Sequence, residues 1–109
     1  MRQANVLYRD TIAGLLVEDE NGYTFTYYDD YLLDASAEPI SLTFPLIAKP
    51  YQSNVLFPFF DGLIPEGWLL DIATHNWKIN PSDRMGLLLA CCKDCIGAIG
   101  IVAKQNEEE

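Results

Sequence analysis

The chain has 109 residues and a formal net charge of −9, because 16 acidic residues outweigh seven basic ones. Half of the residues are hydrophobic and 12% are aromatic, which favours one folded domain over a disordered chain. So acidic a protein would repel phosphate backbones, which argues against direct nucleic-acid binding. The charge favours a basic protein surface, such as an ATP-binding cleft, as a partner, or it serves only solubility.

The apolar runs of the sequence are short. The first is interrupted by Glu18, Asp19 and Glu20, and the last by Lys93 and Asp94. Neither approaches the length of a membrane span, and the N-terminus does not resemble a signal peptide. We therefore expect a cytoplasmic protein without a membrane association.

The N-terminal quarter predicts a β-meander. Residues 5–8 and 12–17 have the composition of short strands, with Arg9-Asp10 as the tight connection between them. Gly14, inside the second strand, indicates a bulge or a close approach of another chain segment.

A second hairpin should follow. Asn21-Gly22 is typical of a hairpin turn, where the pair supplies the positive φ angles. In residues 23–27 aromatic side chains alternate with threonines, and this period of two predicts a strand with one aromatic face.

The middle of the chain is less regular. We expect a helical turn over residues 29–33, capped by Asp29 or Asp30, with the apolar side chains of residues 31–33 packing inward. Residues 40–44 predict a short strand. The prolines within and after residues 46–60 favour a shaped loop there, which its phenylalanines should hold against the domain.

Two helices and a strand complete the prediction. One helix should begin near Pro65 and bury a stripe formed by Leu69, Ile72, Ala73 and Trp77. The second should start at residues 80–83, where Asn-Pro-Ser-Asp provides a cap, and be enclosed over residues 85–92. A last strand is expected over residues 97–102. The fold class is then α+β: a small antiparallel sheet or partial barrel packed with two helices, one domain over residues 1–104, with an acidic tail over residues 105–109.

Catalytic groups that converge are not evident. His75 is the only histidine, and its place in the first helix favours an exposed residue over a catalytic base. Cys92 and Cys95 have the C-x-x-C spacing of a zinc site and Cys91 adds a thiol, but a second ligand pair is missing. Buried cysteines that pack behind an apolar helix explain this cluster better. We therefore predict neither an enzyme nor a cofactor or metal site.

Trp68 is the strongest candidate for a binding residue. In a helical projection it lies at the edge of the buried stripe, in the first turn after a Gly- and Pro-rich segment. A large aromatic side chain on a rigid corner is typical of a hot spot in a protein interface. Periodicity alone is equally consistent with Trp68 packing against residues 57–60.

Longer motifs resemble a known family. Residues 59–68, Phe-Phe-Asp-Gly-Leu-Ile-Pro-Glu-Gly-Trp, are similar to a signature in the N-terminal region of HipA-type serine/threonine kinases, the toxins of bacterial toxin–antitoxin modules. Residues 41–46, 81–90 and 93–98 resemble, in order, further elements of the same region. The resemblance therefore spans nearly the whole chain.

HipA-type kinases continue for hundreds of residues into a catalytic core, whereas this sequence stops where the N-terminal subdomain would end. It is therefore similar to HipS-type antitoxins of three-component systems. The resemblance implies two partners: a HipT-like kinase that lacks this subdomain and is inhibited by it, and a HipB-like DNA-binding protein. It places the partner-binding residues at the start of the first helix and in the loop before it: Asp61, Pro65, Glu66, Gly67 and Trp68.

Three other functions stay open at this stage. The chain could complete the kinase as an assembly or substrate-docking subunit without inhibiting it. A thiolate-metal or redox protein would use the cysteine cluster. A direct transcription factor is disfavoured by the charge and by the lack of a recognisable DNA-reading helix.

Overall fold

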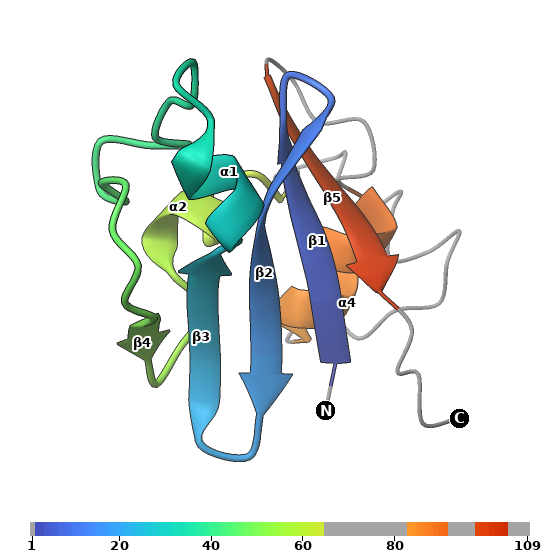
Figure 1. Cartoon of the computed structure of the whole chain (residues 1–109). Coiled ribbons are helices and arrows are strands. Elements are labelled where there is room, and N and C mark those ends of the chain that lie inside the picture. The colour runs from blue at the N-terminus through green and yellow to red at the C-terminus, as the bar shows by residue number, and fades with distance from the viewer. Residues whose placement is uncertain (1, 65–82, 92–97, 105–109) are drawn as a thin grey trace.

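The computed structural model describes residues 2–64, 83–91 and 98–104, which build a five-stranded sheet and three short helices (Figure 1). The sheet order is β4-β3-β2-β1-β5, and every neighbouring pair is antiparallel. This confirms the predicted α+β fold with a small antiparallel sheet. The strands are β1 Arg2–Tyr8, β2 Thr11–Asp19, β3 Gly22–Tyr27, β4 Tyr51–Ser53 and β5 Ile99–Lys104.

The first turn of the meander is as tight as predicted. Tyr8 pairs with Thr11, so that only Arg9 and Asp10 lie between β1 and β2. Their φ angles are 52° and 68°. Two positive φ angles are what a type I′ hairpin turn requires, although neither residue is a glycine.

The second turn differs in detail from the prediction. Gly22 has a φ of 129°, but Asn21 is not among the residues with positive φ, so the expectation that both residues adopt it was wrong. The Asn21 N–H donates a hydrogen bond of 2.8 Å to the Asp19 carboxylate, so the Asp19 side chain stabilises the turn.

Gly14 lies at a crowded point of the sheet. The register between β1 and β2 shifts next to it, between Val6 and Leu7. A Cβ atom at residue 14 would lie 2.7 Å from the Phe25 ring and 2.7 Å from the Thr26 carbonyl oxygen. The predicted bulge and the predicted close approach are therefore both present.

The helices are α1 Asp29–Leu33, α2 Pro58–Asp61 and α4 Arg84–Cys91. In Figure 1, α4 lies behind β1 and β5, against one face of the sheet. Its start agrees with the predicted cap at residues 80–83, and Met85, Leu87 and Leu88 are fully buried as expected for an enclosed helix. The helix predicted from Pro65 lies outside the described residues. Within the described ranges, no helix has the length and apolar character needed to traverse a bilayer.

α1 forms where predicted but packs differently. Its N-cap is Tyr28, and no side chain caps it, so the capping role expected for Asp29 or Asp30 was wrong. Tyr31 is buried and stacks on Tyr27 with 5.8 Å between the ring centroids. Leu33 is 82% exposed, because successive positions of a single helical turn point in different directions.

Residues 40–44 are not a strand, contrary to the prediction. The Tyr27 hydroxyl accepts a hydrogen bond of 3.0 Å from the Ile40 N–H and donates one to the Phe44 carbonyl oxygen. One side chain of β3 thus ties both ends of the segment into a turn, which the Phe44 N–H closes by donating to the Ser41 carbonyl. Burial raises the pKa of the Tyr27 hydroxyl from 10 to about 12, so it stays a donor even in moderately alkaline solution.

The expectation of an irregular loop over residues 46–60 was only partly right. The segment contains β4, which pairs with β3, and the start of α2. Pro58 occupies the first turn of α2, where its missing N–H costs nothing.

The predicted packing of the phenylalanines on the domain is confirmed. Phe57 and Phe60 join Phe25 and Phe44 in a buried aromatic cluster with centroid distances of 5.1 to 6.1 Å. The core therefore lies between the sheet, α2 and α4.

Candidate partner-binding site

Only one of the five predicted binding residues lies within the part of the chain that the structure describes. Pro65, Glu66, Gly67 and Trp68 lie outside the described residues, while Asp61 lies within them. The structure does describe the segments that lead into and out of residues 65–82. We call residues 57–64 the entry flank and residues 83–91 the exit flank.

The entry flank is fixed to the core. The side chains of Phe60 and Ile64 are 0% and 2% exposed. Turn hydrogen bonds run from the Leu63 N–H to the Phe60 carbonyl (3.0 Å) and from the Ile64 N–H to the Asp61 carbonyl (3.2 Å). The chain therefore reaches residue 65 from a position that packing determines.

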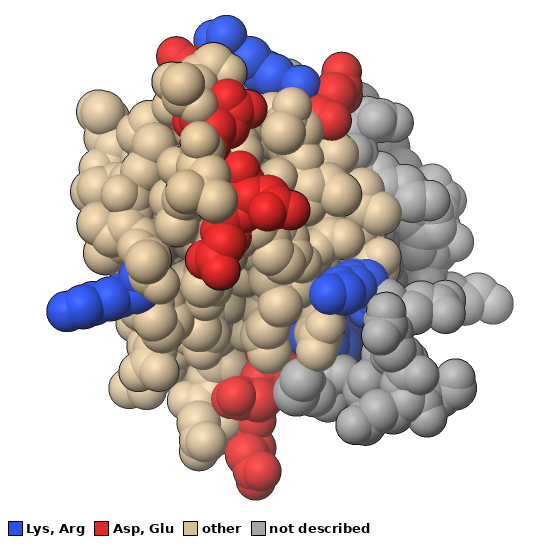
Figure 2. Space-filling model, in the orientation of Figure 1, with Lys and Arg blue, Asp and Glu red and all other residues tan. Residues whose placement is uncertain are grey.

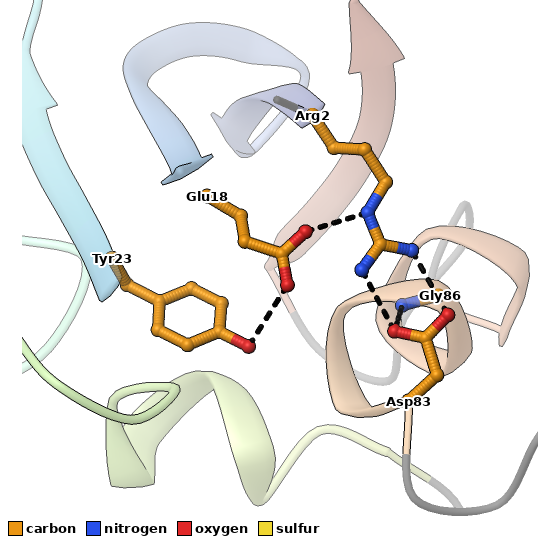
Figure 3. A network of polar contacts seen from close by, with 5 residues as sticks. All are labelled: Arg2, Glu18, Tyr23, Asp83 and Gly86. Atoms are coloured by element: carbon orange, nitrogen blue, oxygen red, sulfur yellow. Dashed lines mark hydrogen bonds and ion pairs between the residues drawn. The ribbon is translucent and has the colours of Figure 1, made fainter. Parts of the chain in front are cut away.

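The exit flank is fixed by Asp83, which precedes α4 (Figure 3). Its carboxylate accepts a hydrogen bond from the Gly86 N–H (3.1 Å), as an N-cap does, and its carbonyl accepts one from the Leu87 N–H (3.0 Å). A Cβ atom at residue 86 would lie 2.4 Å from this carboxylate, so the glycine leaves it room.

Arg2 connects that cap to the sheet. Its two terminal nitrogens donate to the two Asp83 oxygens at 2.8 and 3.0 Å, and its Nε donates to Glu18 at 2.6 Å. The Tyr23 hydroxyl donates to the other Glu18 oxygen at 3.2 Å, so that four side chains form one chain of contacts (Figure 3). The hydrogen bonds from Arg2 lower the pKa of Asp83, whereas burial and then the Glu18 charge raise the pKa of Tyr23.

Asp61 joins the two flanks directly. It accepts a hydrogen bond of 2.6 Å from Nε of Arg84, the first residue of α4. The side chains of Asp61 and Arg84 are 43% and 34% exposed. The structure thus places Asp61 as a brace between the flanks, and its contact with a partner stays a prediction.

Charged side chains are unevenly distributed over the surface. Asp29, Asp30 and Asp34 are exposed on and beside α1, and Figure 2 shows acidic side chains gathered over this part of the molecule. The hydrogen bonds from Ser36 lower the pKa of Asp34. This region therefore presents negative charge at neutral pH.

The described part of the structure does not bring the candidate catalytic and metal-binding residues together. His75, Cys92 and Cys95 lie outside it, and Cys91 is the last residue of α4. Among residues 2–64, 83–91 and 98–104, no three His, Cys, Asp or Glu side chains are grouped as a metal site would require. The interpretation of the cysteines as packing residues stays a prediction.

The match to a family model decides the relationship. Residues 4–102 match the model described as the HipA N-terminal domain. The chain belongs to the HipA N-terminal domain family. The match is to this N-terminal domain and not to a kinase domain.

This HipA N-terminal domain is similar to one protein of nearly the same length and to part of a much longer protein. It is 37% identical over 101 residues to an uncharacterized protein of Haemophilus influenzae, and the alignment covers 93% of this chain and 92% of that protein. It is also 28% identical over 108 residues to Y4mE of Sinorhizobium fredii, a protein named as a kinase, and the alignment covers 98% of this chain but only 26% of Y4mE. The domain therefore matches nearly all of one relative and about a quarter of the other.

A solved structure of the N-terminal domain of HipA toxin has the same fold. It matches with a TM-score of 0.75 and 33% sequence identity, over 97% of this chain and 95% of that one. The sequence signal that found the relationship was the motif of residues 59–68. The side chains that brace the flanks, Arg2, Glu18 and Arg84, gave no such signal, because their partners are distant in sequence.

Proposed function

We propose that this HipA N-terminal domain acts as an antitoxin that binds and inhibits a HipA-like serine/threonine kinase of the HipT type. A HipB-like DNA-binding protein would join the two in a ternary complex. The observation that carries the proposal is the family match over residues 4–102. A kinase that lacks this subdomain would keep a surface that fits it, and a separate copy would bind there.

The Haemophilus relative supports a separate role for the domain. Nearly all of that protein, 92%, aligns with this chain. A protein that consists of little more than this domain would act by binding a partner that supplies the kinase core.

The inhibitory element would be the start of the segment between the flanks. Trp68 follows four residues after the buried Ile64, and Asp61 braces that entry point against Arg84. A fixed entry lowers the entropy that binding costs. Trp68 would enter or border the kinase active site, with Pro65, Glu66 and Gly67 shaping its approach.

Mutation of Trp68 tests the mechanism. Trp68→Ala should weaken binding and inhibition of the proposed partner kinase by about tenfold or more, or about 1.4 kcal/mol, as expected for a buried aromatic anchor. Calorimetric titration and a kinase assay would measure both effects. Leu33→Ala is the matched control, because Leu33 is an apolar side chain that is 82% exposed and far from the motif in sequence. Full inhibition by a folded Trp68→Ala protein would refute the mechanism.

An assembly subunit is the second candidate function, and the match to Y4mE favours it. In that protein the same domain accounts for 26% of a longer chain named as a kinase. A separate copy would then complete the kinase instead of silencing it. Co-expression distinguishes the two: an antitoxin restores growth of cells that produce the kinase, whereas an assembly subunit leaves the kinase active.

A further inference from the structure

A groove lies at the β4 end of the sheet and reaches the start of the entry flank. It has a volume of about 460 Å³ and is open to solvent. The described residues that line it come from the 41–44 turn, from β4 and from the start of α2, and they include Thr43, Phe44, Tyr51, Gln52, Phe57 and Phe59. No function described above uses this groove.

The groove follows the free edge of β4. Tyr51 and Gln52 are successive residues, whose side chains point to opposite faces of the sheet, yet both line it. Since no β3 residue does, the groove lies on the side of β4 away from β3. Half of the β4 backbone groups point that way. Among the described residues, the strand's only backbone pairing is with β3.

The walls of the groove fit a large apolar side chain. Phe44, Tyr51, Phe57 and Phe59 contribute rings, and the centroids of Phe44 and Tyr51 lie 4.9 Å apart in an edge-to-face arrangement. The segments that border it also expose apolar residues: Leu42 is 98% exposed and Val55 is 66% exposed. Exposed apolar side chains that adjoin an apolar hollow are typical of a protein interaction surface.

The charge of this region does not favour a basic occupant. Between Glu38 and Asp61 the sequence contains no acidic residue, and Lys49 is its only basic one, although the whole chain carries 16 acids. No charged side chain is among the described residues that line the groove. An uncharged segment therefore complements it better than the basic surface that the rest of the molecule favours.

We propose that the free edge of β4 and this groove bind an extended, uncharged segment of the partner kinase, which adds to the sheet as a further strand. One of its large apolar side chains fills the groove, while its backbone bonds to β4, as in strand addition to an exposed sheet edge. This rests on the proposed function and adds a second contact to it. One wall of the groove is the start of α2, which belongs to the entry flank, so one partner can reach both surfaces.

Two substitutions that keep the fold test the groove. Thr43→Trp fills it from an exposed position, and Gln52→Glu places a negative charge in it, also from an exposed position. Each should weaken binding of the proposed partner kinase by about tenfold or more, as loss of a central anchor does. Thr11→Glu, on an exposed residue at the far end of β2, adds the same charge elsewhere and should leave the affinity unchanged within about twofold.

Hydrogen exchange tests the added strand itself. Backbone amides of residues 51–53 should exchange more slowly in the complex than in the free chain, since strand addition pairs groups that are now open. Calorimetry for the affinities and mass spectrometry for the exchange would be carried out on the same preparations.

The outcomes separate this inference from the proposed function. If the wild-type chain binds the kinase but both groove variants bind equally well, or residues 51–53 gain no protection, the groove proposal is wrong and the antitoxin proposal stands. If the wild-type chain does not bind the kinase, both are wrong. If the chain alone sediments as a dimer that Thr43→Trp disrupts, a second copy occupies the groove instead and the proposal is overturned.

Discussion

Single residues hold this fold at points where several chain segments meet. Tyr27 is one, because its hydroxyl closes the 40–44 turn while its ring packs in the core. Gly14 is another, because its missing side chain lets β2 approach Phe25. The importance of Gly14 was predictable, because a glycine inside a predicted strand indicates a bulge or a close contact. The role of Tyr27 was not predictable, because no sequence pattern shows which groups a tyrosine hydroxyl will bond.

Substitution of Gly14 by alanine should therefore destabilise the protein. The added methyl group would lie 2.7 Å from both a buried ring and a backbone oxygen. Neither can move freely, so we expect a loss of about 1–3 kcal/mol in the free energy of unfolding, the usual cost of overpacking. Urea denaturation followed by circular dichroism would measure it. An alanine variant as stable as the wild type would contradict the close approach, and Ala13→Gly serves as a comparison on the neighbouring residue.

At the scale of elements, the position of α4 depends on contacts across the whole chain. Arg2 and Asp83 are 81 positions apart, yet their bidentate pair fixes the start of this helix to β1. The sequence predicted the helix and its cap from local signals. It did not predict the arginine, because which of seven basic residues reaches the cap depends on where the fold places the N-terminal strand.

The Arg2–Asp83 pair should contribute to stability in a pH-dependent manner. Asp83 has a lowered pKa in the folded protein, so its contribution is present above the unfolded value of about 4 and is lost as the pH falls through the lower folded value. Because both side chains are more than a third exposed, the coupling at neutral pH should be only about 0.2–1 kcal/mol. A double-mutant cycle with Arg2→Met and Asp83→Asn, repeated at pH 7 and at pH 2–3, would measure it. A coupling that does not decrease in acid would refute this assignment.

At the scale of the whole molecule, acidic residues are unevenly distributed along the chain. The net charge is −9, but the stretch between Glu38 and Asp61 carries no acid. A protein with this distribution should be attracted to a basic partner from a distance and held by apolar contacts at close range. Under the proposed function, the flanks, the groove and the acidic surface would contribute different parts of one binding process.

Under the proposed function, the association rate with the kinase should depend on salt more than the dissociation rate does. Raising the ionic strength from about 0.05 to 0.5 M shortens the screening length, which should slow association severalfold and leave dissociation nearly unchanged. Stopped-flow fluorescence or surface plasmon resonance would measure both rates. The variant Asp29→Asn/Asp30→Asn should reduce the salt dependence of the association rate. If salt instead changes mainly the dissociation rate, the proposed role of the acidic surface in association is wrong.

The sequence by itself determined the meander, the existence and start of α4, the fold class and the family. These rest on neighbouring residues: a period of two, a turn glycine, a capping aspartate and one contiguous motif. Only the tertiary structure decided that residues 40–44 form a turn, that residues 51–53 form an edge strand, and that Arg2, Asp61 and Arg84 brace the flanks. The physical reason is that a side-chain hydrogen bond or a strand pairing needs a partner from a distant segment, and only the folded chain brings that partner within reach.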